Sequence, residues 1–442
     1  MKHALKLLSF AFVVLAARPV IAVDLPMALQ AALASDPTLA SAAANRDAAA
    51  EGVALAGARL LPQLSLQYTT QHLEQTTTQA NGSSEFLGRT VSTQLSLRQG
   101  LYRPRDWVGV DIARQQSELG SFRHAAAQSD LWTRTVAAWI DVLAAQAVRD
   151  VYVRTLASAT LSAEQEQRRF GAGEGTRDAM VEAAAQRAGV RAQLAEAGLD
   201  LRSKLQAFNL LTRLEVLAFD AYQLPAVTRL GLLPEFEQAL LDRILATNPD
   251  LAAMRAAEAV SERRLAQASA DHLPTLDLIG AVNRAQNDST NTLGARYHNT
   301  QIGVQLVVPI FAGGGVNAAQ RQAAAAYVAA QADREAMVQR LRTQFVSDWN
   351  AQTALRERGE AAGGLVEAAR EQRWAIELGI KKGLRTWAEF GAADQSLARR
   401  ESDLVSLTGQ LIKTQARLLS LLPATDSAWD RWALAVSGLA RL

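Results

Sequence analysis

Residues 61–66 read Leu-Pro-Gln-Leu-Ser-Leu, and residues 273–278 read Leu-Pro-Thr-Leu-Asp-Leu. The two stretches are 273 − 61 = 212 residues apart. Leu33–Ala40 (LASDPTLA) and Leu245–Ala252 (LATNPDLA) match at the same offset, since 245 − 33 is also 212. Two ungapped, proline-bearing matches at one offset predict an internal duplication. We assign residues 23–224 to a first structural repeat and residues 225–423 to a second.

Each of the motifs at 61–66 and 273–278 opens a segment in which apolar and polar residues alternate. Alternation of period two is typical of a half-buried strand, so we predict strands at about 64–72, 89–98, 275–285 and 299–308. A polar, turn-rich loop is predicted between the strands of each pair, at 76–88 and at 287–294.

A proline-free stretch follows each strand pair and is rich in good helix formers. Glycines break each stretch once, which predicts two helical hairpins, at about 105–215 and 313–422, with the glycines at their tips. The tip glycines of the first hairpin are Gly171, Gly173 and Gly175, and Gly383 marks the second. Two shorter helices, at about 26–34 and 38–60, are predicted before the first strand.

The N-terminus has the pattern of a secretory signal peptide. Two lysines within the first six residues precede an apolar run from Leu7 to Ala17, and small residues lead up to Ala22. We predict cleavage after Ala22, because the run is shorter than the ~20 residues that a spanning helix needs. Residues 424–442 form a C-terminal tail.

The composition argues against several functions. Lys plus Arg total 46 against 44 Asp plus Glu, and removal of the three basic residues of the signal peptide leaves 43 against 44, a net charge of −1. Such a balance gives no reason to expect nucleic acid as a partner. The chain has no cysteine and five histidines. We therefore predict no enzyme activity, no cofactor and no metal site.

The lengths of the predicted elements point to a membrane. Strands of about ten residues are long enough to cross a bilayer when tilted, but four strands cannot close a barrel, since the smallest membrane barrels have about eight. Open edges are not tolerated in lipid, so several chains must combine their strands. Tyr102 and Phe311, at the strand-to-helix junctions, are candidate membrane-interface aromatics. The alternative is that they are core residues at a hinge.

Several motifs, in this order, make the chain resemble the TolC-type outer-membrane efflux and secretion channels (outer membrane factors). They are ALASDPTL, LLPQLSL, AWIDVLAAQ (138–146), RFGAGEGTRDAM (169–180), VVPIFAGGG (307–315) and GLRT (383–386). The resemblance implies a mixed α/β membrane protein: a homotrimer with a twelve-stranded transmembrane barrel, four strands per chain, continued by a long periplasmic α-helical barrel. It also implies the outer membrane of a Gram-negative bacterium, contact with outer-membrane lipid, a periplasmic adaptor, and an inner-membrane ABC or proton-driven transporter.

In this family a tyrosine, an arginine and acidic residues near the second glycine turn close the periplasmic entrance. Carried over to this chain, Arg385 matches the arginine and Glu389 stands where an aspartate is usual. The tyrosine position holds Ile380, and a second acidic position holds Ala392. Asp178 replaces the threonine of a Thr-Asp pair. The resemblance thus makes Asp178, Arg385 and Glu389 candidate gate residues.

Three classes of function stay open. The first is an export duct. The absence of a lipid-attachment cysteine and the GEGTR turn favour type I protein secretion, and small-molecule efflux is the alternative. The second is a periplasmic coiled-coil adaptor or scaffold, which would not need two pairs of membrane-length strands. The third is a secreted enzyme, for which the sequence offers no catalytic set. The stretch GAGEGT at 171–176 lacks the Gly-Lys-Ser/Thr ending of a phosphate-binding loop.

Overall fold

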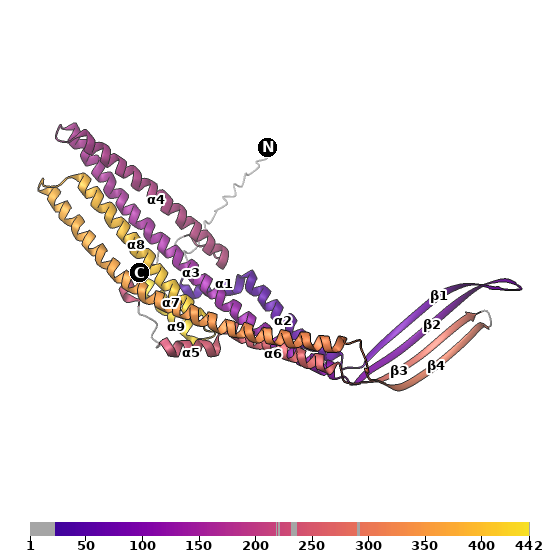
Figure 1. Ribbon diagram of the computed structural model, residues 1–442. Coiled ribbons are helices and arrows are strands. Elements are labelled where there is room, and N and C mark those ends of the chain that lie inside the picture. Colours follow the sequence, from indigo (N-terminus) through magenta and orange to yellow (C-terminus); the bar gives the residue numbers. More distant parts are fainter. Residues whose placement is uncertain (1–22, 218, 220–221, 231–236, 290–291, 442) are drawn as a thin grey trace, which may run out of the picture.

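The computed structural model describes residues 23–217, 219, 222–230, 237–289 and 292–441 (Figure 1). A four-stranded sheet stands at one end of an elongated molecule, and two helical hairpins run from it to the other end, where their tips lie near each other (Figure 1). The predicted signal peptide, residues 1–22, lies outside the described residues.

The described elements of the first half are α1 (Leu25–Ser35), α2 (Pro37–Ala58), β1 (Gln63–Gln79), β2 (Gly82–Tyr102), α3 (Pro104–Gly171) and α4 (Arg177–Thr212). Those of the second half are η1 (Val227–Arg229), α5 (Glu237–Thr247), α6 (Pro249–Ala270), β3 (Thr275–Ser289), β4 (Thr292–Val307), α7 (Gly315–Lys381) and α8 (Trp387–Ser420), followed by α9 (Ser427–Ala440). Apart from η1 and α9, the order of the second half repeats that of the first, which confirms the duplication.

The repeated motif at 33–40 and 245–252 contains the start of a helix in both halves. Pro37 and Pro249 are the first residues of α2 and α6, where a missing N–H costs nothing. The preceding Asp36 and Asn248 cap the helices by accepting hydrogen bonds from the backbone N–H groups two residues beyond the prolines, at 2.9 and 2.8 Å. The same local chemistry therefore turns the chain from a short helix into a longer one in each repeat.

The strands form one antiparallel sheet in the order β1-β2-β3-β4, and the β2–β3 pair joins the two halves. They are longer than predicted. Most of the predicted loop 76–88 is strand, because its threonines and serines fit a pleated sheet and only residues 80–81 form the turn. The predicted loop 287–294 was also wrong in extent, since β3 continues to Ser289 and β4 begins at Thr292. Within the described chain, β1 and β4 each have a free edge.

The helical part is held together by one large apolar core. Trp139, Ile140 and Phe345 are fully buried within it. The C-terminal tail belongs to this core as well, because α9 buries Trp429 edge-to-face against Trp132 of α3. None of the described helices is both long and apolar enough to span a bilayer.

Candidate functional site: the sheet and the helix tips

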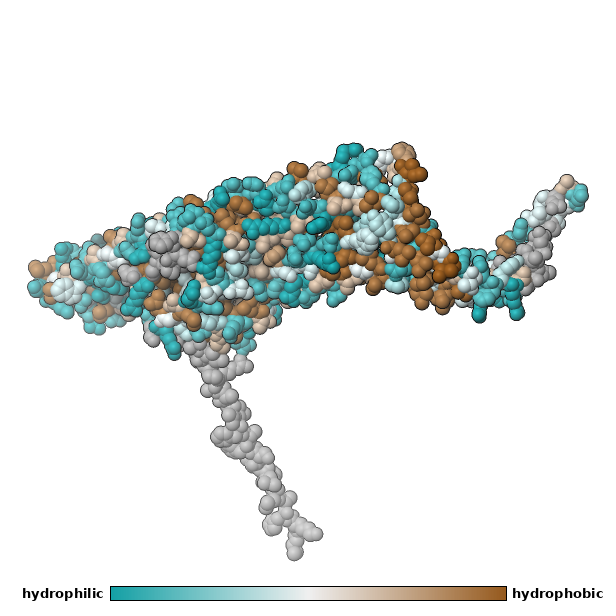
Figure 2. Space-filling model, turned by 90° about the horizontal axis from the view of Figure 1, so that it is seen from below, coloured by the Kyte–Doolittle hydropathy of each residue, from teal (hydrophilic) through white to brown (hydrophobic). Residues whose placement is uncertain are grey.

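The sheet has two chemically different faces. Because the four strands pair in register, residues directly opposite one another share a face. One face is apolar near the helices, and eight of its eleven side chains are exposed. The eleven are Leu64, Leu66, Tyr68, Leu95, Leu97, Leu276, Leu278, Val282, Ile302, Val304 and Leu306. Figure 2 shows this as a hydrophobic band between the helical body and the hydrophilic far end of the sheet.

The opposite face is mostly polar over the same stretch. Its side chains include Ser65, Gln67, Gln94, Ser96, Asn283, Gln301 and Gln305. A sheet with an apolar outer side and a polar inner side matches the wall of a transmembrane barrel with a watery interior. The band is therefore a lipid-facing surface.

A buried carboxylate ties the sheet to the first long helix. Asp277 of β3 is 1% exposed and accepts hydrogen bonds from Arg98 of β2, at 2.6 and 3.1 Å, and from Arg103, at 2.7 and 2.7 Å. Arg103 directly precedes α3 and also reaches Asp106, at 3.3 Å. The hydrogen bonds to Asp277 raise the pKa of the Arg103 guanidinium, which stays charged at any physiological pH. The cluster connects both repeats at the point where strands give way to helices.

The two candidate interface aromatics occupy different surroundings. Tyr102 is 38% exposed and packs edge-to-face on Trp107, with ring centroids 5.2 Å apart. Phe311 is 87% exposed. Trp107 was missed by the sequence analysis, although its position one helical turn after the β2–α3 junction is the signal that could have found it. Three aromatic side chains at the end of the apolar band fit an interfacial girdle, whereas the exposure of Phe311 does not fit a hinge core.

The helix tips are two versions of one turn. Gly171 ends α3, and Gly173 and Gly383 hold equivalent places in the two turns, with φ angles of +77° and +72° that disfavour any side chain. The N–H of Glu174 donates to the carbonyl of Arg169, and that of Leu384 to Gly379, both at 2.9 Å. These bonds satisfy carbonyls at the helix ends.

Arginine and glycine exchange places between the tips. In the first tip Arg169 faces Gly175, and a Cβ at Gly175 would lie 3.2 Å from that of Arg169. In the second tip Gly379 and Arg385 hold the corresponding positions, and a Cβ at Gly379 would lie 2.5 Å from Cγ of Arg385. At Gly379 a side chain would therefore displace Arg385. At Gly175, where the Cβ would also lie 3.0 Å from the backbone nitrogen of Phe170, a side chain would require a small shift of the turn.

The structure brings two of the three candidate gate residues together. Arg385 donates to Glu389 at 3.0 Å, one turn apart in sequence. The other carboxylate oxygen of Glu389 accepts from the backbone N–H of Thr386 at 2.8 Å, while the Thr386 hydroxyl accepts from the Glu389 N–H at 3.2 Å. These contacts form a capping box, which the Thr-x-x-Glu spacing could have revealed. The backbone bond, followed by Arg385, lowers the pKa of Glu389.

The third candidate is separate within the chain. Asp178 lies in the first turn of α4, where a negative charge is favourable. No contact between Asp178 and Arg385 is found among the described residues of the single chain. Ala179 holds the position equivalent to Glu389, so the first tip keeps only half of a capping box, the bond from the Ala179 N–H to Thr176. The two tips therefore differ in charge at equivalent positions.

A cluster of ion pairs links the two hairpins between the tips and the sheet. Glu401 of α8 accepts from Arg154 of α3 at 3.0 Å and from Arg370 of α7 at 2.7 Å. It lines a cleft of about 600 Å³. Glu401 is largely buried and both arginines are more than half exposed, so the contacts orient the helices more than they stabilise them. Among the described residues, no group of three His, Cys, Asp or Glu side chains is arranged to hold a metal ion.

Comparison with known proteins gives a consistent result. The family described as "Outer membrane efflux protein" matches residues 28–212 and 240–423. The outer membrane protein TolC of Vibrio cholerae is 32% identical over 310 residues, which cover 68% of each chain. The alkaline protease secretion protein AprF of Pseudomonas aeruginosa is 27% identical over 97% of this chain and 90% of its own.

A solved structure extends the likeness to the fold. The outer membrane channel CmeC of Campylobacter jejuni superimposes with a TM-score of 0.76 at 16% identity, over 93% of this chain and 89% of its own. The chain belongs to the outer membrane efflux protein family, a TolC-type family of channels rather than enzymes, whose members lie in the outer membrane with their helices in the periplasm.

Proposed function

We propose that three copies of this chain form the exit duct of a tripartite export system. The observation that carries the proposal is the four-stranded sheet with one lipid-facing side and two free edges. A free edge is not tolerated in lipid, and four strands are too few to close, whereas three sheets of four give a barrel of ordinary size. The helical hairpins would continue the barrel as a tunnel, since α3 has 68 residues and is about 100 Å long at 1.5 Å per residue.

The duct would be passive. Its partners would be a periplasmic adaptor and an inner-membrane ABC or proton-driven transporter that supplies the energy. The aromatics Tyr102 and Phe311 would mark the periplasmic edge of the membrane. The alternative interpretation, a periplasmic adaptor, is not retained because the chain belongs to an outer-membrane family and its sheet has a lipid-facing side.

The proposed cargo is protein, by a type I route. Support comes from the protease secretion protein AprF, whose similarity spans nearly the whole chain. Small-molecule efflux remains the second candidate, supported by the description of the matched family. The two are separated by deleting the gene and measuring both secreted protein and drug tolerance. Loss of an extracellular protein with unchanged tolerance supports secretion, and the opposite pattern supports efflux.

The tips would form the periplasmic gate. Arg385 would pair with Asp178 across a helix interface in the assembled trimer, where a charged pair could latch the tips at low energetic cost. Within one chain Arg385 already contacts Glu389, so opening would involve a change of partner. Glu389, whose side chain is 42% exposed at the tip, would also place three carboxylates around the axis and favour cations.

Planar-bilayer conductance of the detergent-purified protein tests the proposal, with the oligomer mass determined in the same sample. A trimer that gives small, steady, cation-selective currents supports it, and Arg385→Ala should raise the conductance while Glu389→Ala weakens the selectivity. A species that stays in water without detergent and never inserts would refute it. If Arg385→Ala has the conductance of the wild type, the proposed Arg385–Asp178 latch is refuted and the rest of the proposal is unaffected.

A further inference from the structure

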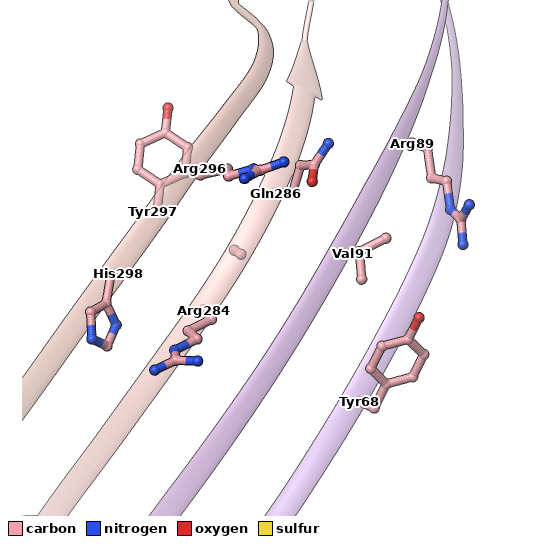
Figure 3. Close-up of a pocket in the computed structure, with 9 residues that line it drawn as sticks. Tyr68, Arg89, Val91, Arg284, Gln286, Arg296, Tyr297 and His298 are labelled. Carbon is pink, nitrogen blue, oxygen red and sulfur yellow. The ribbon is translucent and has the colours of Figure 1, made fainter.

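A cluster of basic side chains lies on the lipid-facing side of the sheet, beyond the apolar band. Arg284 of β3 is directly opposite His298 of β4, and Arg296 of β4 is directly opposite Gln286 of β3. Figure 3 shows Arg284 extending toward His298 and Arg296 toward Gln286. All four side chains are exposed. They line a shallow hollow of about 530 Å³ that also includes Tyr68 and Val91.

The arginines of this cluster have no counter-ion among the residues that the structure describes. Within the part of the chain that the structure describes, neither Arg284 nor Arg296 has an ion pair or a side-chain hydrogen bond. They occupy diagonal positions on neighbouring strands, so their charges repel. The carboxylates on this face whose side chains are described, Glu74 and Glu85, lie nearer the tip of the β1–β2 hairpin. An exposed pair of like charges attracts an external anion.

The height of the cluster in the membrane follows from the register. Arg284 lies eight residues beyond Leu276, or about 26 Å along the strand at 3.3 Å per residue. With a strand tilt of about 40°, this is roughly 20 Å across the membrane, near the outer end of the ~25 Å apolar band of such barrels. The turn between β1 and β2 stands at the end of the molecule opposite the helix tips (Figure 1). Because the helices are periplasmic, the cluster lies at the outer leaflet, at the level of the lipid headgroups.

We propose that Arg284, Arg296 and His298 bind the phosphate of an anionic lipid of the outer leaflet. A guanidinium group matches a phosphate with two parallel hydrogen bonds, and a headgroup held there would place its acyl chains along the exposed Ile302 and Val304 below. Tyr68, in the same row of the sheet as Arg284, is an interfacial aromatic at that level. The inference rests on the proposed barrel and assigns it a lipid-specific contact.

Native mass spectrometry of the full-length channel in neutral detergent tests the assignment. The probes are bis-phosphorylated lipid A and the same lipid without its phosphates. The wild-type oligomer is expected to retain the phosphorylated lipid, and the double variant Arg284→Gln/Arg296→Gln to bind it about 10- to 100-fold more weakly. Arg187→Gln/Arg191→Gln removes the same charge from exposed positions of α4 and should bind like wild type. Arg284→Lys/Arg296→Lys should keep part of the affinity.

Three results would overturn the proposal. They are equal retention of the two lipids, unchanged binding by the glutamine double variant, and an equal loss of binding in the α4 control. Displacement of the lipid by millimolar inorganic phosphate would show a free-phosphate site instead. If the glutamine double variant fails to assemble, the single variants are measured and each should bind more weakly. Conductance is recorded from the same samples. A variant that conducts but does not bind the lipid shows a pore without this contact, and a variant that binds the lipid but does not conduct shows the contact without a pore. This inference and the proposed function can therefore fail separately.

Discussion

The substitution Asp277→Asn probes the joint between barrel and tunnel. It keeps the shape of the side chain and removes the charge that faces Arg98 and Arg103. Breaking a buried ion pair costs about 3–5 kcal/mol because the remaining charge is left unpaired. Arg98 is 59% exposed and can turn to water, while Arg103 is only 26% exposed, so we take the lower end, about 3 kcal/mol.

Hydrogen exchange measured by mass spectrometry is the suitable assay, because it reports local opening of the native protein. A decrease of about 3 kcal/mol in the free energy of local opening corresponds to exchange roughly 100-fold faster in the peptide that covers residues 98–106. The matched control is Asp271→Asn, which breaks the Arg105–Asp271 pair, whose arginine is 59% exposed. That variant should change exchange by less than about fivefold.

A double variant shows whether the mechanism is right. If the cost arises from Arg103, which would keep only its 3.3 Å contact with Asp106, then Arg103→Gln combined with Asp277→Asn should cost clearly less than the sum of the two single changes. Additive effects, or equal effects of Asp277→Asn and Asp271→Asn, would refute the reasoning.

Three further predictions concern the tips and the tail. Gly379→Ala should reproduce the conductance of Arg385→Ala, because the new methyl group would displace Arg385, whereas Gly363→Ala, with open space around it, should behave like wild type in the same bilayer recordings. Because the pKa of Glu389 is lowered from 4.5, its contacts persist above that value and are lost only as pH falls through the lowered pKa, so single-channel conductance should be constant down to about pH 4.5 and should change only below it. Trp429→Ala should destabilise the chain by about 3–5 kcal/mol through the cavity it leaves, seen as a lower Tm and faster proteolysis of α9; an unchanged Tm would contradict the tail's place in the core.

The sequence was sufficient for those features that local patterns determine. The proline-bearing motifs at 61–66 and 273–278 predicted the duplication, and period-two alternation predicted four strands. The glycines of the hairpins marked the turns, where Gly173 and Gly383 need positive φ. These features depend on residues close together in the chain, so a single sequence carries their signal.

Features that depend on register could not be predicted. Arg284 and Arg296 are twelve residues apart, and only the pairing of β3 with β4 brings them to one face. The ends of the strands were missed because serine and threonine are common both in turns and in strands that leave the membrane. The contact of Arg385 with Glu389 followed from a capping box whose spacing was present but not used, and the packing of Trp429 on Trp132 has no local signal at all.

Cross-linking between the free sheet edges tests the proposed trimeric barrel. The chain has no cysteine, so a single introduced pair gives an unambiguous product. Gln67→Cys on β1 is combined in turn with cysteine at Asn299, Gln301 or Gly303, which lie on the same polar face at the other edge. Oxidation of intact outer membranes should give, for one register, a covalent ladder that ends at three chains. A ladder that ends at two or extends beyond three, or no product in any register, would contradict a barrel built from three sheets.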